Sequence, residues 1–294
     1  MKAISMKKKE LIFKIGMITI MVILAIIALA PFYWSILISF REQEFIYTDR
    51  SWFFSHVTFD HYANVFKDVP IVRYFFNTLL LTVVNITTNL LLASMAAYGF
   101  EKLPFRGSKV IFKIMMFSMM LPGIATTVPT FLLLRSFPLV GGNDILGQGG
   151  TGFIGTFLGV ILPGTVGVYG IFFMRQFFIP VGGDYAEAAR LDGAGELKIF
   201  FRIYLPMVVP ALLTLGIFCF QGVWNSYMWP NLVLQGHDDL KVLTMALRDY
   251  SIETKFQYGP MMAMSVLMSI PIIIAFCCMQ KYFISGVQVG GVKG

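Results

Sequence analysis

Six long apolar segments constrain this chain more than any other feature of its sequence. A helix that crosses the hydrocarbon core of a bilayer needs about 20 predominantly apolar residues. Six segments meet that requirement: residues 15–38, 75–97, 110–134, 154–178, 207–233 and 259–283. Of the 294 residues, 57% are hydrophobic and only 13% are charged, whereas soluble domains are about 45–50% apolar and about 25% charged. The sequence therefore predicts an all-α, polytopic membrane protein whose six transmembrane helices form one domain over residues 1–294.

The first segment also has features of a secretory signal peptide. Lys7, Lys8 and Lys9 precede it, and Ala28-Leu29-Ala30 is similar to a cleavage site. Its apolar run is longer than the roughly 7–15 residues of a signal peptide. Residues 17–36 contain no charge and ten Leu, Ile, Val or Phe residues, which favour insertion by roughly 3 to 6 kcal/mol. A retained helix is therefore the preferred interpretation.

The distribution of basic residues predicts the orientation of the chain. With six spans both termini lie on one side, which carries 14 Lys and Arg, whereas the three opposite loops carry 8. The positive-inside rule places both termini, and residues 179–206, in the cytoplasm. The formal net charge of +7 reflects this orientation and not nucleic-acid binding, because the bases flank the spans and cover no single amphipathic face.

Several chemical functions find no support in the sequence. Cys219, Cys277 and Cys278 lie in apolar runs, which predicts no disulfide, metal site or redox role. Residues 147–152 match G-x-G-x-x-G, but no strand precedes them, so a flexible outer loop is expected. The sequence has no G-x-x-x-x-G-K-[ST] motif. We therefore expect that this chain binds no cofactor and is not an enzyme, and that any ATP that drives it is bound by another subunit.

The polar residues within the spans are neutral. Carriers driven by protons or ions usually need Asp, Glu, His or Arg near the membrane midplane, and the six spans have essentially none. Amides beside aromatic rings suit an uncharged, hydroxyl-rich solute. For any one of these polar or aromatic residues, however, the favoured interpretation is interhelical hydrogen bonding or a place in an interfacial aromatic belt, and not contact with a solute. The candidate residues of a substrate pathway are Asn77, Asn85, Asn89, Gln221, Trp224, Asn225 and Tyr227.

Glycines make the fourth apolar segment unusual. Gly155 and Gly159 are spaced as G-x-x-x-G, and Gly164, Gly167 and Gly170 follow. Small residues allow helix backbones to approach one another closely. We predict that these glycines serve helix packing.

The stretch DYAEAARLDGAG, residues 184–195, is the most polar passage between two apolar segments. Asp184 is predicted to cap a short helix over residues 185–191, with Glu187 as the reciprocal partner in a capping box. Gly193 and Gly195 are expected to end this helix. Residues 196–204 then read as a second helical piece, with one face formed by Leu197, Phe200, Phe201 and Tyr204.

These residues carry a family resemblance. Glu187-Ala188-Ala189, then Gly193, then Ile203-x-Leu205-Pro206 resemble the EAA motif of ABC importer membrane subunits. The resemblance covers nearly the whole chain and points to the smaller six-span partner of the maltose-type, carbohydrate-uptake permeases, through passages such as WNSYMWP and QKYFISGVQVGGVKG. It implies a type I ABC importer permease fold in the bacterial cytoplasmic (inner) membrane, with a coupling loop at residues 180–206 and a cytoplasmic tail at residues 284–294.

The resemblance also implies partners and roles. The coupling residues would be Asp184, Glu187, Ala188, Ala189 and Gly193, docked on two ATPase subunits that carry ATP and Mg. The other partners would be a second homologous permease and an extracytoplasmic solute-binding protein, which residues 235–257 would approach. Residues 285–294 would touch the ATPases. The expected function is import of an oligosaccharide or related sugar across the lipid bilayer by alternating access. The alternatives are a permease for glycerol phosphate or a polyamine, or a stand-alone secondary carrier or channel.

Overall fold

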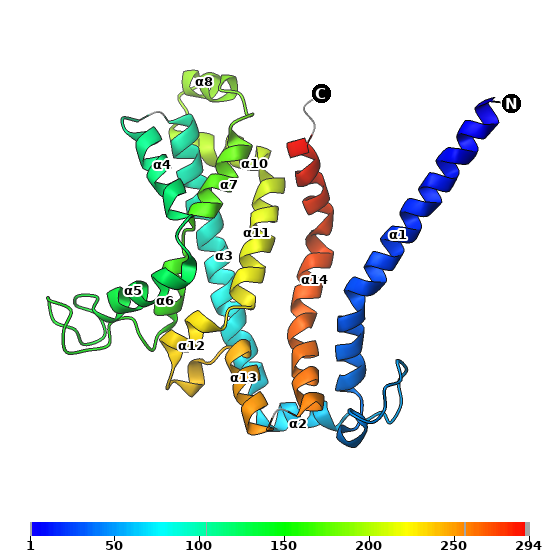
Figure 1. Ribbon diagram of the computed structural model, residues 1–294. Helices are drawn as coiled ribbons and strands as arrows, with labels where there is room; N and C mark the ends of the chain where they lie inside the picture. The colour runs from blue at the N-terminus through cyan, green and yellow to red at the C-terminus, as the bar shows by residue number, and fades with distance from the viewer. Residues whose placement is uncertain (1, 104, 256, 292–294) are drawn as a thin grey trace. The chain divides into compact units, whose positions relative to one another are not determined.

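The structure is a computed structural model, and in the part of the chain that it describes the regular elements are helices joined by loops (Figure 1). It describes the backbone of residues 2–103, 105–255 and 257–291 and the side chains of residues 9–103, 105–255, 257–278 and 280. Over these residues the only β-type pairing is an isolated bridge between Arg41 and Val57. The α-helices are α1 Lys2–Ser39, α2 Asp60–Asp68, α3 Ile71–Lys102, α4 Ser108–Ser118, α5 Gly123–Arg135, α6 Phe157–Ile161, α7 Val168–Phe178, α8 Asp184–Leu191, α9 Glu196–Ile199, α10 Leu205–Met207, α11 Val209–Trp224, α12 Met228–Leu234, α13 Leu243–Glu253 and α14 Tyr258–Gly291. Short helices of other types are η1 Gln43–Phe45, η2 Leu162–Gly164, η3 Phe200–Tyr204 and η4 Asp238–Leu240.

The candidate membrane spans agree with the predicted number. Three helices are long and apolar enough to cross a membrane by themselves, namely α1, α3 and α14. Three bent pairs meet the same test: α4 with α5, the α6–η2 segment with α7, and the α9–α10 segment with α11. If each pair is one span, the described residues contain up to 6 spans. The C-terminal tail expected at residues 284–294 continues α14 as far as Gly291, and residues 292–294 lie outside the described residues.

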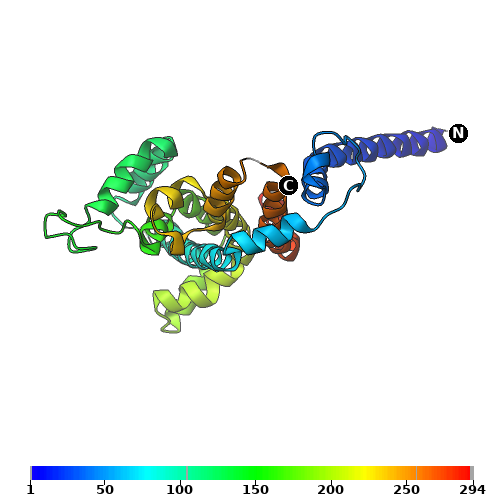
Figure 2. The same ribbon diagram turned by 90° about the horizontal axis from the view of Figure 1, so that it is seen from below.

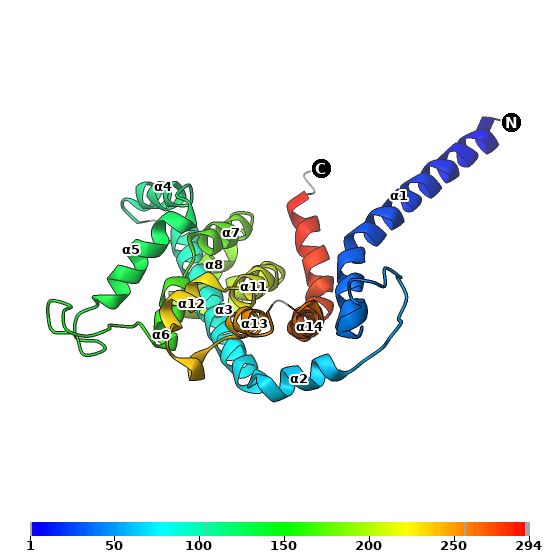
Figure 3. The same ribbon diagram turned by 60° about the horizontal axis from the view of Figure 1, so that its bottom comes forward.

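Three of the predicted spans are interrupted by breaks in their helices. Residues 110–134 are not one helix, because α4 and α5 meet at an angle of 106° beside Pro122 (Figure 3). Residues 154–178 bend by 40° after η2, which contains Pro163. Proline lacks a backbone N–H and disfavours helical geometry in the residue before it. Residues 207–233 are also interrupted, because α11 ends at Trp224 and α12 is a separate short helix.

The chain forms two compact units, residues 1–70 with 247–270 and residues 71–246 with 271–294. In the first unit, the buried Arg41 organises the loop between α1 and α2. Its guanidinium donates hydrogen bonds to the carbonyl oxygens of Asp49 (2.5 Å) and Ser51 (2.9 Å). Hydrogen bonds from Ser55 and then from Ser51 lower the pKa of the Asp49 carboxyl to about 2. The loop is therefore held by a buried cation and a stable carboxylate.

In the second unit, α3 packs against both α7 and α11. Its 32 residues extend for about 48 Å at about 1.5 Å per residue, which exceeds the roughly 30 Å of a bilayer core. Buried residues from all three helices meet in one apolar core, for example Ala97, Met174 and Leu215. The predicted packing role of the glycines is confirmed for Gly170, where an added Cβ would lie 2.9 Å from Asn89 Oδ1.

The glycine-rich residues 147–152 belong to a loop between α5 and α6, which projects away from the neighbouring helices (Figure 2). No strand precedes them among the described residues, so they do not form a dinucleotide-binding turn. The loop is more ordered than the expected flexible connection. Asn143 Nδ2 donates to the Arg135 carbonyl oxygen (2.8 Å), and Asn143 Oδ1 accepts from the Gly150 N–H (2.8 Å).

We expect the substitution Gly152→Ala to destabilise this loop strongly. Gly152 has a φ of +59°, and a Cβ there would lie 2.1 Å from the Leu134 carbonyl oxygen. Left-handed geometry costs a side-chain-bearing residue about 1–2 kcal/mol, and the backbone clash adds to that. In Gly142→Ala, where φ is +83° and the nearest atom would be 3.8 Å away, only the strain applies. Thermal unfolding of the purified variants, followed by tryptophan fluorescence, should show a larger loss for Gly152→Ala; equal losses would contradict a role for the clash.

Candidate functional site

The polar stretch between the fourth and fifth apolar segments forms the helix α8. The predicted helix over residues 185–191 is confirmed, with Asp184 as its first residue. The predicted capping box is wrong, because Gly183 occupies the N-cap position and no side chain caps the helix. Gly183 already has near-helical backbone angles (φ −78°, ψ −23°), so the helix starts one residue earlier than expected. Asp184 and Glu187 thus lie in the first turn, where their charges favour the positive end of the helix dipole.

Gly193 ends α8 as predicted. Its φ is +79°, its N–H donates to the Arg190 carbonyl oxygen (3.0 Å), and the Ala194 N–H donates to the Ala189 carbonyl oxygen (2.9 Å). This pair of hydrogen bonds is the Schellman motif, which satisfies carbonyl groups at a helix C-terminus. Gly195 is extended (φ −74°, ψ 158°) and precedes α9. The left-handed turn therefore depends on Gly193 alone.

A cluster of Arg190, Glu196 and Tyr98 ties the end of α8 to α3. Arg190 Nε donates to Glu196 Oε1 (2.6 Å), and Arg190 Nη2 donates to Glu196 Oε2 (3.3 Å). The Tyr98 hydroxyl, from α3, donates to the same Glu196 Oε2 (2.8 Å). The hydrogen bond to Glu196 raises the pKa of Arg190, so this pair stays ionised. We call these three residues the carboxylate tether.

The start of α8 is held by two further side chains. The Tyr204 hydroxyl, from η3, donates to the Gly182 carbonyl oxygen (3.0 Å). Lys102 Nζ, at the end of α3, donates to the Val181 carbonyl oxygen (2.5 Å) and lies 5.6 Å from the centre of the Tyr204 ring. Both ends of α8 are therefore fixed to the helices behind it. Sequence reasoning missed Arg190, Glu196, Tyr98 and Lys102, because residues that meet across a turn or from distant helices share no regular spacing.

The second helical piece, residues 196–204, exists as α9 followed by the π-helix η3. Its predicted apolar face is wrong in part. Phe200 and Tyr204 are buried, but Leu197 is 65% exposed and Phe201 is 45% exposed. The buried face is rotated, because Ile199 joins Phe200 and Tyr204 in the apolar core beside Tyr98.

The outer surface of α8 combines carboxylates with apolar groups. Asp184, Glu187 and Ala188 are exposed, and Ala189 is half-buried. Leu191 is 90% exposed, an unusual state for a leucine next to charged residues. Since Ala186 is the only buried residue of α8, most of this helix is available for contact with another protein.

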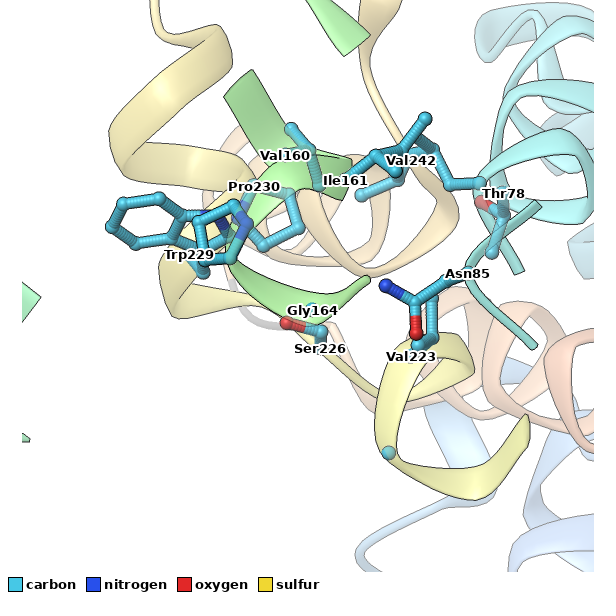
Figure 4. A pocket seen from close by; sticks show the side chains of 13 residues that line it. Thr78, Asn85, Val160, Ile161, Gly164, Val223, Ser226, Trp229, Pro230 and Val242 are labelled. Carbon is cyan, nitrogen blue, oxygen red and sulfur yellow. The ribbon is translucent and has the colours of Figure 1, made fainter. Parts of the chain in front are cut away.

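A cavity of about 280 Å³ lies near the opposite end of α3 (Figure 4). Its walls come from α3, α6, η2, α11 and α12 and from Ser226 and Val242 in the connecting segments, and none of the lining side chains is charged. Asn85 supplies an amide, and the buried Nε1 of Trp229 has no hydrogen-bond partner. The Thr78 hydroxyl is already engaged, since it donates to the Tyr74 carbonyl oxygen (2.7 Å) and accepts from the Leu243 N–H (3.0 Å). The cavity thus offers amide and indole groups between apolar walls.

Of the seven residues predicted for a substrate pathway, Asn85 alone lines this cavity. The amides of Asn77 and Asn89 bind backbone carbonyl groups, at Asp239 and Lys241 for Asn77 and at Gly164 for Asn89. Trp224 is buried, with Phe75 and Phe220 beside its ring. The remaining three are exposed: Gln221, Asn225 and Tyr227. Thr78 and Val242 also line the cavity, and no pattern in the sequence points to them.

The chain matches a known protein family over a region that includes α8 and the carboxylate tether. Residues 89–289 match the family model described as "Binding-protein-dependent transport system inner membrane component". The chain is 34% identical over 239 residues to the arabinooligosaccharides transport system permease protein AraQ of Bacillus subtilis, covering 81% of this chain and 80% of AraQ. It is 29% identical over 273 residues to the diacetylchitobiose uptake system permease protein NgcG of Streptomyces coelicolor, covering 92% of this chain and 86% of NgcG.

A solved structure has a similar fold. It is the crystal structure of a bacterial ABC transporter involved in the import of the acidic polysaccharide alginate, and the TM-score is 0.76 at 24% sequence identity. The match covers 92% of this chain and 96% of the other. The predicted fold class, all-α with the architecture of an ABC importer permease, is confirmed.

We expect Tyr98→Phe to loosen α8 while leaving the rest of the chain folded. The substitution removes the hydroxyl that binds Glu196 and keeps the ring in the core. Loss of a hydrogen bond to a charged group costs about 1.5 kcal/mol. This loss should speed amide hydrogen exchange in Asp184–Leu191 roughly tenfold. Arg190→Gln should have a smaller effect, because the Arg190–Glu196 pair is about 40% exposed. Unchanged exchange in Tyr98→Phe would contradict the tether.

Proposed function

Because this chain belongs to the family of binding-protein-dependent transport system inner membrane components, we propose that it is the sugar-translocating permease subunit of an ATP-driven ABC importer. It is a membrane-embedded transport component. The observation that supports the proposed role as a permease subunit is the family match over residues 89–289. That region includes α8, which is exposed and is bound at both ends to the membrane helices.

The solute that we propose is a neutral oligosaccharide or a related sugar. Relatives named for arabinooligosaccharides and diacetylchitobiose support this class. The cavity supports it independently, because Asn85 supplies an amide and Trp229 an aromatic ring among its lining residues, and none of these residues has a charged side chain. Amides and indoles can bind hydroxyl groups, and apolar walls can cover the faces of a sugar ring. A cationic polyamine or an anionic phosphate ester would need a counter-charge that these walls do not have.

We propose that α8 is the coupling helix that docks on an ATPase subunit. Asp184, Glu187 and Ala188 are exposed on it, and Ala189 and Gly193 form its closing turn. The complex would contain two ATPases that bind ATP and Mg, a second homologous permease and an extracytoplasmic solute-binding protein. The charge bias of the loops supports a cytoplasmic position for α8 and both termini. We propose that the membrane is the inner membrane of a bacterial cell.

Helix α3 connects α8 to the cavity of about 280 Å³ and could transmit a movement from one to the other. The carboxylate tether binds α8 to α3 at Tyr98, and Asn85 of the same helix lines the cavity. These residues lie 13 positions apart, about 20 Å along the helix at about 1.5 Å per residue. Closure of the ATPases would pull α8, and α3 would transmit the movement to the cavity walls. This is the alternating-access step that we propose.

The direct test is ATP-driven uptake by the importer complex, purified through this chain and placed in liposomes. With its binding protein, the wild-type complex should import arabinotriose, diacetylchitobiose or lactose. Glu187→Lys should reduce uptake more than tenfold without loss of membrane insertion, because a like-charge contact with a basic docking surface costs several kcal/mol. Glu187→Gln keeps the size of the side chain, so partial uptake is expected. Normal uptake by Glu187→Lys would refute the docking role, and wild-type flux without ATPases would refute the importer.

We expect Gly222→Leu to reduce uptake by filling the cavity. Gly222 lines the cavity, and a Cβ there would meet no atom within 4 Å, so the new side chain enters empty space without disturbing the fold. Gly16→Leu in α1 is the matched control, since its Cβ is equally unhindered and it does not line the cavity. The same liposome assay should show slower uptake for Gly222→Leu alone. Equal uptake by both variants would exclude the cavity from the solute pathway.

A further inference from the structure

A second cavity, of about 270 Å³, lies between α3, α4 and α7, apart from the solute cavity and the carboxylate tether. It is lined by Phe100, Ser108, Lys109, Phe112, Lys113 and Arg175. Three of these six side chains are cationic, whereas no side chain that lines the solute cavity is charged. The transport function proposed above uses none of them.

The positive charge of this cavity is only partly balanced. Arg175 forms an ion pair with Glu101 (2.9 Å) and stacks over the Phe112 ring, 4.3 Å from its centre. Its Nε is buried without a hydrogen-bond partner. Across the described residues, neither Lys109 nor Lys113 takes part in an ion pair. The cavity is therefore lined by two lysine charges that have no ion-pair partner among the described residues.

The geometry of α4 strengthens the preference for an anion. Lys109 and Lys113 are spaced i, i+4 and so share one face of the helix. Ser108 and Lys109 are the first two residues of α4, where the helix dipole favours negative charge. A phosphate group fits this combination of lysine ammonium groups, a hydroxyl and an arginine donor.

The surface next to the cavity identifies the source of the phosphate. Val110, Ile111, Ile114 and Phe117 of α4 are all exposed. A free phosphate ion would use only the basic residues, whereas a phospholipid would place its phosphate in the cavity and its acyl chains on this apolar surface. Basic pockets between transmembrane helices on the cytoplasmic side suit such headgroups. We propose that this cavity binds the phosphate headgroup of an anionic phospholipid, which would hold α4 against α3 and α7.

Native mass spectrometry of the detergent-purified importer complex, titrated with phosphatidylglycerol, tests this proposal. The Lys109→Gln/Lys113→Gln double variant should bind phosphatidylglycerol roughly 30-fold more weakly than wild type, at about 1 kcal/mol for each lysine. Lys109→Arg/Lys113→Arg preserves both charges and should retain binding. Lys9→Gln/Lys14→Gln removes two exposed charges from α1 and should bind phosphatidylglycerol as wild type does. This control distinguishes a specific binding site from an effect of the total charge of the protein.

Two comparisons distinguish the ligand. Zwitterionic phosphatidylethanolamine should bind much less tightly than phosphatidylglycerol, and inorganic phosphate at the same concentration should not displace the lipid. Wild-type affinity in the double glutamine variant would overturn the proposal, as would equal losses in the α1 control or efficient displacement by inorganic phosphate. If the double variant cannot be purified, Lys113→Gln alone should weaken binding roughly fivefold, and an unchanged affinity would overturn the proposal in the same way. None of these results depends on which solute is transported.

Discussion

The Glu196 carboxylate is the group on which the attachment of the C-terminal end of α8 to α3 depends. It accepts hydrogen bonds from Arg190 at the end of α8 and from Tyr98 of α3. One oxygen, Oε2, receives donors from both residues. A carboxylate can accept several such bonds because each oxygen has two lone pairs. Without it, the Tyr98 hydroxyl would be left without this acceptor beside the apolar core, and the C-terminal end of α8 would lose the hydrogen-bonded link to α3 that the described residues show.

This interaction gives α3 two roles. Its C-terminal part holds α8 through Tyr98 and Lys102. Its N-terminal part carries Asn85, which lines the cavity of about 280 Å³, and Asn77, which binds the carbonyl groups of Asp239 and Lys241. A continuous α-helix is stiff over such a distance, since every interior backbone group is bonded within it. The helix breaks of the second unit lie in its neighbours, so α3 is the member best suited to transmit displacement without bending.

The sequence predicted those features that depend on composition or on local backbone chemistry. The number of spans followed from hydropathy, and the end of α8 followed from Gly193, whose φ of +79° few other residues adopt. The start of α8 was predicted wrongly because both Gly183 and Asp184 are acceptable N-cap residues. Glu196 and Tyr98 are 98 positions apart, and only the packing of α3 against its neighbours brings them together. The cavity likewise collects residues from five elements, which no linear spacing reveals.

The short length of α8 has a consequence for assembly. Helices below about 12–15 residues are marginal in water by themselves, and α8 has 8 residues. Its helical form therefore depends on groups supplied by the membrane helices: Tyr98, Lys102 and Tyr204. A chain whose membrane core had not yet formed would expose a disordered peptide at this position. The docking that we propose for α8 would then require completed folding of the membrane core, and so it would also act as a maturation checkpoint.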